Sequence, residues 1–382
     1  MKILHIISSL NPNLGGPSKG LIDIANGYIK DGHELTICCF DKSEDNFIKN
    51  SNLDIVCFSN SIKIKSLFNL YLWIIKNGNK YNSVFINGIW QKFAIPIMYS
   101  LTKLKIPYYI FPHGMLDPAF RKIYPIKHIK KLIYWKLFEH KFVSSSAGLI
   151  FTCQEEMLLA RKNFKPYKTK EFVIPYGISN PPINSTELSQ QFLQKYPILK
   201  NKNIILFLSR INDKKGLDLL VQAFLQIRLK YDDLHLLIAG PDNDNLQSKI
   251  IKKYIKEIDS KSITWAGMLQ GEDKWGAFYS ATVYCLPSHQ ENFGIAIVEA
   301  LSCGVPVVIS DKVNIYREIE SAGAGFIGND DVDETRQSLI KFFSCSTIEI
   351  SKMKASALKL YAESFNIDNT IKKLALISQS KS

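Results

Sequence analysis

Hydrophobic positions along the chain follow two alternating patterns. Short runs rich in β-branched residues have the character of buried strands, and the segments between them show the spacing of amphipathic helices. We expect strands at residues 3–8, 34–40, 83–87, 108–111, 148–152 and 172–174, and again at 204–209, 235–239, 263–266, 283–286 and 307–309. This alternation predicts parallel sheets joined by crossover helices.

A turn-rich stretch at residues 179–185 interrupts the pattern, which then begins again. A length of 382 residues also favours two domains over one. The last long segment, about 356–377, contains few helix breakers and is expected to be helical. Ligands of parallel sheets bind beyond the C-terminal ends of the strands, so the residues that follow strands are the candidates for a site.

The lengths of the apolar runs and the positions of the cysteines indicate the cellular compartment. No apolar run reaches the 18 residues of a membrane span, and residues 1–7 lack a cleavage site and resemble a first strand more than a signal peptide. The seven cysteines include no CxxC pair, and several lie in apolar runs, which indicates buried free thiols in a reducing compartment. We therefore expect a cytoplasmic protein.

The net charge of +13 permits nucleic acid, an anionic substrate or an anionic membrane surface as a partner. Between Arg121 and Lys141, seven Lys or Arg residues accompany a single acid, Glu139, and aromatic residues are interleaved. This composition suits an anionic bilayer surface, and it equally suits a solvated basic helix beside a cleft. No RNA-binding motif accompanies the charge, so nucleic acid is not an expected partner.

The most informative motif runs from Glu291 to Glu299, with Pro-Ser before it and Gly-Val-Pro-Val-Val after it. The order predicts a loop, a helix and a buried strand, with Gly294 at a helix start where a ligand can approach backbone N–H groups. Glu299 would lie along the helix, up to ~12 Å from Glu291 at 1.5 Å per residue. Carboxylates accept from sugar hydroxyls and helix N-termini bind phosphate, so the spacing suits a nucleotide-sugar.

Other strand ends carry polar residues as well. Gly15 and Gly16 follow the first strand without forming a GxGxxG fingerprint, and His113, after residues 108–111, could bind a sugar hydroxyl. Arg210 and Lys215 follow the strand at 204–209, where they could stabilise a leaving diphosphate without a metal. Each feature has a plain alternative, namely a tight turn, a structural histidine or a solvated basic loop.

Two Asp-x-Asp strings are candidates for magnesium ligands. Asp242 with Asp244, and Asp331 with Asp333, could hold Mg²⁺ against a phosphate. Both lie in polar, turn-like stretches, so we expect neither to bind a metal.

Taken in order, Gly15-Gly16, His113, Arg210 with Lys215-Gly216, and the Glu291–Glu299 motif resemble the retaining family 4 glycosyltransferases, among the glycosyl transferases group 1. The resemblance covers nearly the whole chain and is strongest from about residue 204 to 310. It implies an α/β GT-B fold, with two Rossmann-like doubly wound parallel-sheet domains facing across a cleft. Residues 1–178 would bind the acceptor and residues 179–364 the nucleotide-sugar, and the helix at about 365–382 would pack back on the first domain.

The resemblance also implies roles for individual residues. Arg210 and Lys215 would bind the donor diphosphate, Glu291 the transferred sugar and Glu299 the ribose hydroxyls. The remaining expected contacts are backbone N–H groups of Phe293, Gly294 and Ile295 to sugar or phosphate, residues 265–269 with Met268 and Leu269 beside the base, and Gly15, Gly16 and His113 from the opposing domain. The expected catalytic residues are Arg210, Lys215, Glu291 and His113, with no metal and no cofactor beyond the donor substrate.

Three positions depart from the family pattern. Ser209 and Asn292 stand where the family usually has glycine, and Tyr176 replaces a frequent asparagine. None of these changes removes a charged ligand.

The expected function is the transfer of a sugar, with retention, from a nucleoside diphosphate sugar to a hydroxyl of a glycan or lipid-linked acceptor. The expected setting is cell-surface polysaccharide biosynthesis, in a cytoplasmic enzyme that can bind the inner face of the membrane. Three alternatives stay open: a GT-B sugar phosphorylase, a non-catalytic nucleotide-sugar-binding protein and a nucleic-acid-binding protein.

Overall fold

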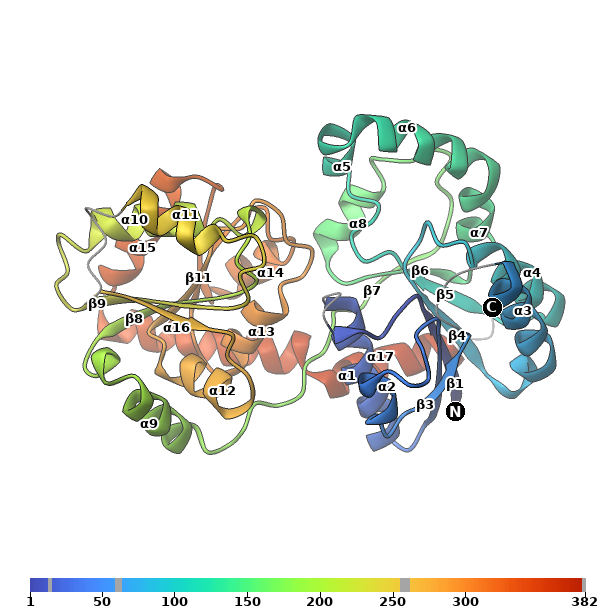
Figure 1. Ribbon diagram of the computed structural model, residues 1–382, viewed down its shortest axis with the longest axis horizontal. Helices are drawn as coiled ribbons and strands as arrows, with labels where there is room; N and C mark the ends of the chain where they lie inside the picture. Colours follow the sequence, from blue (N-terminus) through green and yellow to red (C-terminus); the bar gives the residue numbers. More distant parts are fainter. Residues whose placement is uncertain (13–15, 59–63, 255–261, 380–382) are drawn as a thin grey trace. The chain divides into compact units, whose positions relative to one another are not determined.

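The computed structural model describes residues 1–12, 16–58, 64–254 and 262–379, which form two compact units (Figure 1). Unit 1 comprises Met1–Ser179 together with Ile367–Ser382, and unit 2 comprises Asn180–Asn366. Each unit is a parallel β-sheet covered by helices on its faces (Figure 1).

The sheet of unit 1 has seven strands in the order β3-β2-β1-β4-β5-β6-β7. The strands are β1 (Lys2–Ile7), β2 (Glu34–Cys39), β3 (Asp54–Cys57), β4 (Ser83–Asn87), β5 (Tyr108–Phe111), β6 (Gly148–Phe151) and β7 (Glu171–Val173). The helices are α1 (Gly16–Lys30), α2 (Asn46–Lys49), α3 (Ile64–Asn77), α4 (Ala94–Leu104), α5 (Ala119–Ile123), α6 (Pro125–Tyr134), α7 (His140–Ser144), α8 (Gln154–Ala160) and α17 (Ile367–Gln379), with a π-helical turn at Trp135–Glu139.

The sheet of unit 2 has six strands in the order β10-β9-β8-β11-β12-β13. The strands are β8 (Asn203–Leu208), β9 (Leu234–Ala239), β10 (Ile263–Gly267), β11 (Val283–Leu286), β12 (Val307–Ser310) and β13 (Gly325–Gly328). The helices are α9 (Ser185–Lys195), α10 (Leu217–Ile227), α11 (Leu246–Lys253), α12 (Gly271–Ser280), α13 (Ile295–Ser302), α14 (Tyr316–Ala322), α15 (Val332–Phe343) and α16 (Thr347–Leu360).

Both sheets are doubly wound, as the sequence predicts. All neighbouring strands pair in parallel, and in each sheet the strand order reverses beside the first strand, between β1 and β4 and between β8 and β11. A crevice forms beyond the carboxyl ends of the strands at such a switch point, because the crossover helices leave toward opposite faces. The residues that follow β8 and β11 are therefore the first candidates for a ligand site in unit 2.

Two edge strands escaped the sequence prediction. β3 consists of Asp54–Cys57 and is partly exposed, and β13 is a four-residue strand that begins and ends with glycine. A Cβ at Gly325 would lie 1.9 Å from the carbonyl oxygen of Val307, so this strand uses glycine to approach β12. Strand prediction from long apolar β-branched runs does not detect edge strands of this kind.

The helix expected at 356–377 is interrupted, which corrects the sequence prediction. α16 ends at Leu360, a π-helical turn spans Tyr361–Phe365, and Asn366 is extended, with φ −72° and ψ 137°. The Asn366 side chain donates to Asn180 Oδ1 at 2.9 Å, and this hydrogen bond stabilises the break in the helix. α17 then begins at Ile367 and belongs to unit 1.

Within unit 1, α17 packs against α1. A Cβ at Gly27 would lie 2.9 Å from Cγ1 of Ile371, so the absence of a side chain there lets the two helices approach closely. Ile371 and Leu374 are buried, and the Tyr109 hydroxyl donates to the carbonyl of Ile377 at 2.6 Å. The helix therefore completes the hydrophobic core of unit 1.

The cysteine side chains of this protein form no disulfide bonds. All seven cysteines are free; four are buried, whereas Cys57, Cys303 and Cys345 are partly exposed, which corrects the expectation of uniformly buried thiols. No helix among the described residues has the length and apolar character needed to cross a bilayer.

Replacing Ile371 by alanine should lower the free energy of unfolding by about 2–5 kcal/mol, because it leaves a cavity between α17 and the rest of the core. Leu376 lies on the same helix with 65% of its surface exposed, so Leu376→Ala should change stability by no more than about 0.5 kcal/mol. Urea denaturation followed by circular dichroism measures both. Equal losses in the two variants would contradict this placement of the helix face.

Candidate functional site

In unit 2, the loops that follow β8 and β11 lie against each other. The first loop forms a 3₁₀ turn at Asp213–Lys215, and Gly216 directly precedes α10 with φ 65°. A Cβ at Gly216 would lie 2.0 Å from the carbonyl oxygen of Pro287, so glycine is required here by both the backbone conformation and the approach. The Lys214 carbonyl accepts from Ser288 Oγ at 2.7 Å and from the His289 N–H at 2.8 Å, which joins the loops directly.

This junction brings together two of the residues expected in the site. Lys215 Nζ donates to Glu291 Oε2, and the two side chains are 9% and 21% exposed. The backbone of Glu291 is held by the loop after β12, because its N–H donates to the Lys312 carbonyl at 3.0 Å and its carbonyl accepts from the Asn314 N–H at 2.9 Å. An ammonium and a carboxylate thus meet at the switch point of the sheet.

The start of α13 lies immediately after this pair. Gly294 precedes the helix with φ 80°, and a Cβ there would lie 2.6 Å from Cδ1 of Ile297. Phe293 is buried and packs edge-to-face on Phe365, with ring centroids 5.6 Å apart, so its side chain serves the core. The N–H groups of Ile297 and Val298 donate to the Gly294 carbonyl at 2.9 and 3.3 Å, whereas the first N–H groups of a helix, here from Ile295, lack an intrahelical acceptor and can bind an anion.

The second glutamate of the motif is also ion-paired. Glu299 lies along α13 with a side chain 6% exposed, and Lys274 Nζ on α12 is 3.0 Å from its Oε1. Lys274 Nζ also lies 4.3 Å from the ring centroid of Trp275. Lys274 was not predicted from the sequence, because a lysine in an ordinary amphipathic helix carries no local signal of a partner 25 residues away.

The other residues expected in unit 2 have simpler surroundings. Arg210 is exposed after β8, and no described residue forms an ion pair with its guanidinium. After β10, Met268 is 62% exposed, whereas Leu269 is buried. The structure therefore joins Lys215 to Glu291 and Lys274 to Glu299, and leaves Arg210 and Met268 open to solvent.

One aspartate of each pair considered as magnesium ligands has a structural role. Asp242 accepts from the N–H groups of Leu246 and Gln247, both at 2.9 Å, at the start of α11. Asp331 caps α15 by accepting from the Glu334 N–H at 2.8 Å. Within the described parts of the chain, no three His, Cys, Asp or Glu side chains gather as ligands for a metal ion.

In unit 1, His113 follows β5 with φ 51°, an uncommon conformation for a residue with a side chain. Its Nδ1 lies 2.5 Å from the Tyr176 hydroxyl, and its Nε2 lies 3.3 Å from Asn87 Oδ1. Donation by Tyr176 to Nδ1 leaves the ring proton on Nε2, directed at Asn87. Because both ring nitrogens have partners, a sugar hydroxyl would have to displace one of them.

The chain of polar contacts continues into the sheet. Asn87 Nδ2 lies 3.3 Å from His5 Nδ1 on β1, and His5 Nε2 is buried with no hydrogen-bond partner among the described residues. Burial lowers the pKa of both His113 and His5 to about 3, so the two rings are neutral near pH 7. Asn87 and Tyr176 were not expected here; a polar residue closing the apolar strand 83–87 was the available signal for Asn87.

The two glycines after the first strand have different standing. Gly16 is exposed at the first position of α1, whereas Gly15 lies outside the described residues. His113 and Gly16 both follow strand ends in unit 1, as the sequence predicts from the strand positions.

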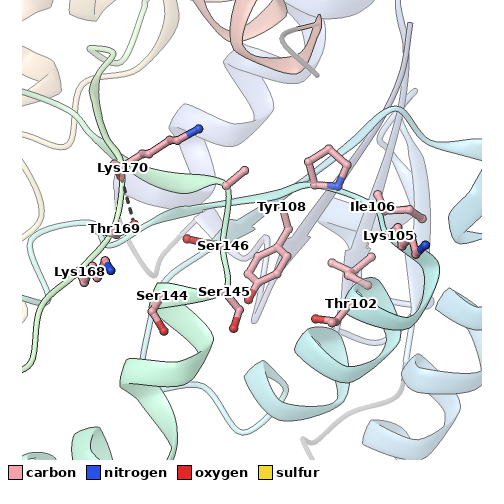
Figure 2. A pocket seen from close by; sticks show the side chains of 13 residues that line it. Thr102, Lys105, Ile106, Tyr108, Ser144, Ser145, Ser146, Lys168, Thr169 and Lys170 are labelled. Carbon is pink, nitrogen blue, oxygen red and sulfur yellow. Dashed lines mark hydrogen bonds between the residues drawn. The ribbon is translucent and has the colours of Figure 1, made fainter. Parts of the chain in front are cut away.

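A separate groove of about 870 Å³ lies at the opposite end of the unit 1 strands, where β5, β6 and β7 begin (Figure 2). Lys105, Lys168 and Lys170 border it together with Ser144, Ser145 and Ser146 (Figure 2). The carbonyl groups at the end of α7 also face this region, since Ser146 and Tyr108 hydroxyls donate to them. The groove shares no residue with the predicted site.

Residues 189–359 match the family model of the Glycosyl transferases group 1. This range contains Arg210, Lys215, Lys274, Glu291 and Glu299.

Among curated proteins, the chain is 32% identical over 159 residues to phosphatidyl-myo-inositol mannosyltransferase from Mycobacterium leprae (strain TN), which covers 40% of the chain and 39% of the relative. The chain thus spans about two fifths of the length of this relative. It is 26% identical over 253 residues to 2-deoxystreptamine N-acetyl-D-glucosaminyltransferase from Niallia circulans, covering 63% and 61% of the two chains. It is 22% identical to an uncharacterized 41.2 kDa protein in the cps region of Klebsiella pneumoniae, covering 95% and 94%.

Solved structures share the architecture over the full length. HepE from Anabaena in complex with UDP and glucose has a TM-score of 0.77 at 17% identity, with all of both chains covered. A glycosyltransferase from Rickettsia africae has a TM-score of 0.81 at 18% identity, with 99% and 97% covered. The two parallel-sheet units therefore have the GT-B fold.

The buried histidine His5 should make unit 1 sensitive to acid. Its folded pKa is about 3 and its unfolded pKa about 6.5, so between these values the unfolded chain binds a proton that the folded chain does not. Stability should therefore fall as the pH is lowered from about 6.5 toward 3, by up to about 1.4 kcal/mol per pH unit from this ring.

His5→Asn should be less stable than wild type at pH 7 and should lose stability less steeply between pH 6.5 and 5. The comparison uses the slope of the free energy of unfolding against pH, because carboxylates titrate equally in both proteins. Identical slopes would show that His5 is not held neutral.

Proposed function

We propose that this chain is a glycosyltransferase that moves a sugar from a nucleoside diphosphate sugar to an acceptor hydroxyl. The observation that carries the proposal is the Lys215–Glu291 pair at the switch point of unit 2, directly before the N-terminus of α13. The match of residues 189–359 to the group 1 glycosyl transferases supports it.

The contact between Lys215 and Glu291 constrains the ligand. A lysine suits a phosphate and a carboxylate suits sugar hydroxyls, and here the two groups touch. A ligand that engages both must carry a sugar directly bonded to a phosphate, which is the linkage that a glycosyl donor breaks. Phosphate would draw the ammonium away from Glu291 and release that carboxylate for the sugar.

In this proposal, Lys and Arg side chains stabilise the leaving diphosphate, a role that a metal ion has in other enzymes. The bond between the anomeric carbon and the phosphate oxygen breaks, and the diphosphate gains negative charge. Lys215, Arg210 and the N–H groups from Phe293 to Ile295 would stabilise that charge, and preorganised groups of this kind lower the barrier. The exposed guanidinium of Arg210 is available for a ligand phosphate.

The transfer proposed here retains the anomeric configuration. The acceptor oxygen bonds to the anomeric carbon on the face that the diphosphate leaves, and the departing phosphate oxygen takes the acceptor proton. His113 is proposed to bind a sugar hydroxyl through a ring that is neutral near pH 7.

The nucleoside would lie along α13 and the loop after β10. Glu299 would accept from the ribose hydroxyls, and Met268 and Leu269 would border the base. Glu299 is buried and ion-paired with Lys274, which supports an acceptor role, because the pair holds the carboxylate in position for a hydrogen bond. The solved HepE complex contains UDP, which makes UDP-sugars the first donors to examine.

We further propose a glycan or lipid-linked acceptor presented at a membrane, within cell-surface polysaccharide synthesis. The names of relatives support this: one acts on a phosphatidyl-myo-inositol, and another lies in a cps region. The stronger support is the surface of α6 and the π-helical turn after it.

That surface combines apolar and basic side chains. Ile126, Ile129, Ile133 and Leu137 recur at helical spacing and are 73%, 59%, 57% and 56% exposed. Lys127, Lys130 and Lys136 are exposed beside them, whereas Lys131 is partly buried with its Nζ 4.8 Å from the Trp90 ring centroid. The one acid, Glu139, is buried and accepts from the Trp90 N–H at 2.7 Å. Exposed isoleucines flanked by lysines suit the interface of an anionic bilayer.

Arg210→Ala and Lys215→Ala should each reduce turnover by about 100-fold, because each removes a charge that stabilises the leaving diphosphate. Lys249 is exposed on α11 of the same unit, so Lys249→Ala is the matched control and should retain wild-type turnover. The assay is release of nucleoside diphosphate from the sugar donor that raises the melting temperature most in a screen. A donor at 100 times its Kd should add about 2.7 kcal/mol of stability.

Wild-type turnover in both site variants would refute the phosphate assignment, and donor binding without any turnover in wild type would indicate a non-catalytic binding protein. The same assay in EDTA should proceed unchanged. Loss of activity in EDTA that Mg²⁺ restores would contradict metal independence.

Replacing Lys127, Lys130 and Lys136 by glutamine should abolish sedimentation with anionic vesicles, since each cation near such a surface contributes about 1 kcal/mol. Ile126→Ser with Ile133→Ser should weaken binding even at low salt, because the apolar insertion is lost. Glutamines at Lys49, Lys80 and Lys103, exposed elsewhere on unit 1, form the charge-matched control. Equal sedimentation of all variants, or of wild type with neutral vesicles, would contradict the membrane proposal.

A further inference from the structure

Lys274 forms an ion pair with the second glutamate of the Glu291–Glu299 motif, a contact that the sequence did not suggest. Its Nζ lies 3.0 Å from Glu299 Oε1 and 4.3 Å from the ring centroid of Trp275. The two side chains are 18% and 6% exposed, so the pair is largely shielded from water. A neighbouring ion pair, between Asp273 on α12 and Lys195 on α9, is exposed at 40% and 54%.

Because the Lys274–Glu299 pair is shielded from water, Glu299 depends on the cation beside it. A carboxylate removed from water binds a proton more readily unless a cation compensates its charge. Breaking a buried pair by removing one member leaves the other uncompensated. Without Lys274, the Glu299 carboxylate would lose the cation that lies 3.0 Å from it and holds it in place, and it would be a poorer acceptor.

The position of Lys274 in the fold links two parts of the predicted nucleoside site. β10 ends at Gly267, Met268 and Leu269 follow, and α12 begins at Gly271. Lys274 thus lies in the first turn of the helix that follows the residues expected beside the base. From there it reaches across to Glu299 on α13.

We infer that Lys274 is a positioning residue for ribose recognition: it holds the Glu299 carboxylate in a fixed orientation, so that the site distinguishes ribonucleotides from nucleotides lacking ribose hydroxyls. The inference rests on the proposed function, specifically on Glu299 as the ribose acceptor. Lys274 acts through Glu299 and need not touch the nucleotide.

The test compares the affinities for UDP and 2′,3′-dideoxyuridine diphosphate by isothermal titration calorimetry. Wild type should bind UDP about tenfold or more tightly than the dideoxy analogue, which is the scale of a hydrogen bond to a charged group. Lys274→Met and Glu299→Ala should both bring this ratio close to one. The double variant should be no worse than Glu299→Ala, because the two residues act as one unit.

Two variants separate the role of the charge from damage to the fold. Lys274→Arg keeps a cation beside Glu299 and should retain most of the discrimination. Lys195→Met removes the exposed ion pair that α9 forms with Asp273, the residue next to Lys274, and should retain all of the discrimination. Melting temperatures measured on the same samples report whether each variant is folded.

Two outcomes would overturn the inference, and they differ. If Glu299→Ala loses the discrimination and folded Lys274→Met keeps it, Lys274 is not a positioning residue and the ribose role of Glu299 stands. If wild type and Glu299→Ala show the same ratio, the ribose role itself is wrong and the inference falls with it.

Discussion

The candidate site depends on one close approach between two loops. The backbone at Gly216 lies against the carbonyl of Pro287 at a distance that excludes any side chain. The Lys214 carbonyl, bonded to Ser288 and His289, fixes the same approach from the other side. Because these loops leave β8 and β11 at the reversal of the strand order, their contact decides that Lys215 faces Glu291.

The charged side chains of the candidate site form ion pairs with one another. Lys215 with Glu291 and Lys274 with Glu299 each bring a cation from one segment to a carboxylate of the motif. Burying ions costs desolvation energy that such pairs offset incompletely, so they are weak evidence for stability and better understood as preorganised polar groups. In the proposed function, a ligand would exchange partners with groups already held in position, without bringing bare charges out of water.

Unit 1 uses neutral groups where unit 2 uses charged ones. Tyr176, His113, Asn87 and His5 form a line of polar contacts from the end of β7 to β1, and burial keeps both histidines uncharged near neutral pH. Tyr176 also packs against Gly20, where a Cβ would lie 2.9 Å from its ring. The tyrosine that departs from the family pattern at this position is thus built into the surrounding packing.

The sequence by itself determined the strands with long apolar runs, the parallel doubly wound organisation and the strand ends that carry charged residues. These features depend on local sequence. Strands buried on both faces need continuous β-branched runs, and glycine occurs where a side chain would clash with a neighbouring segment. The half-exposed β3, the glycine-bounded β13 and the break at Asn366 left no such local record. Only the tertiary structure decided that Lys215 meets Glu291, that Lys274 meets Glu299 and that Tyr176 meets His113, since these pairs join segments 76, 25 and 63 residues apart. Contacts at that separation are selected by how the strands and helices pack, and no residue pattern along the chain encodes them.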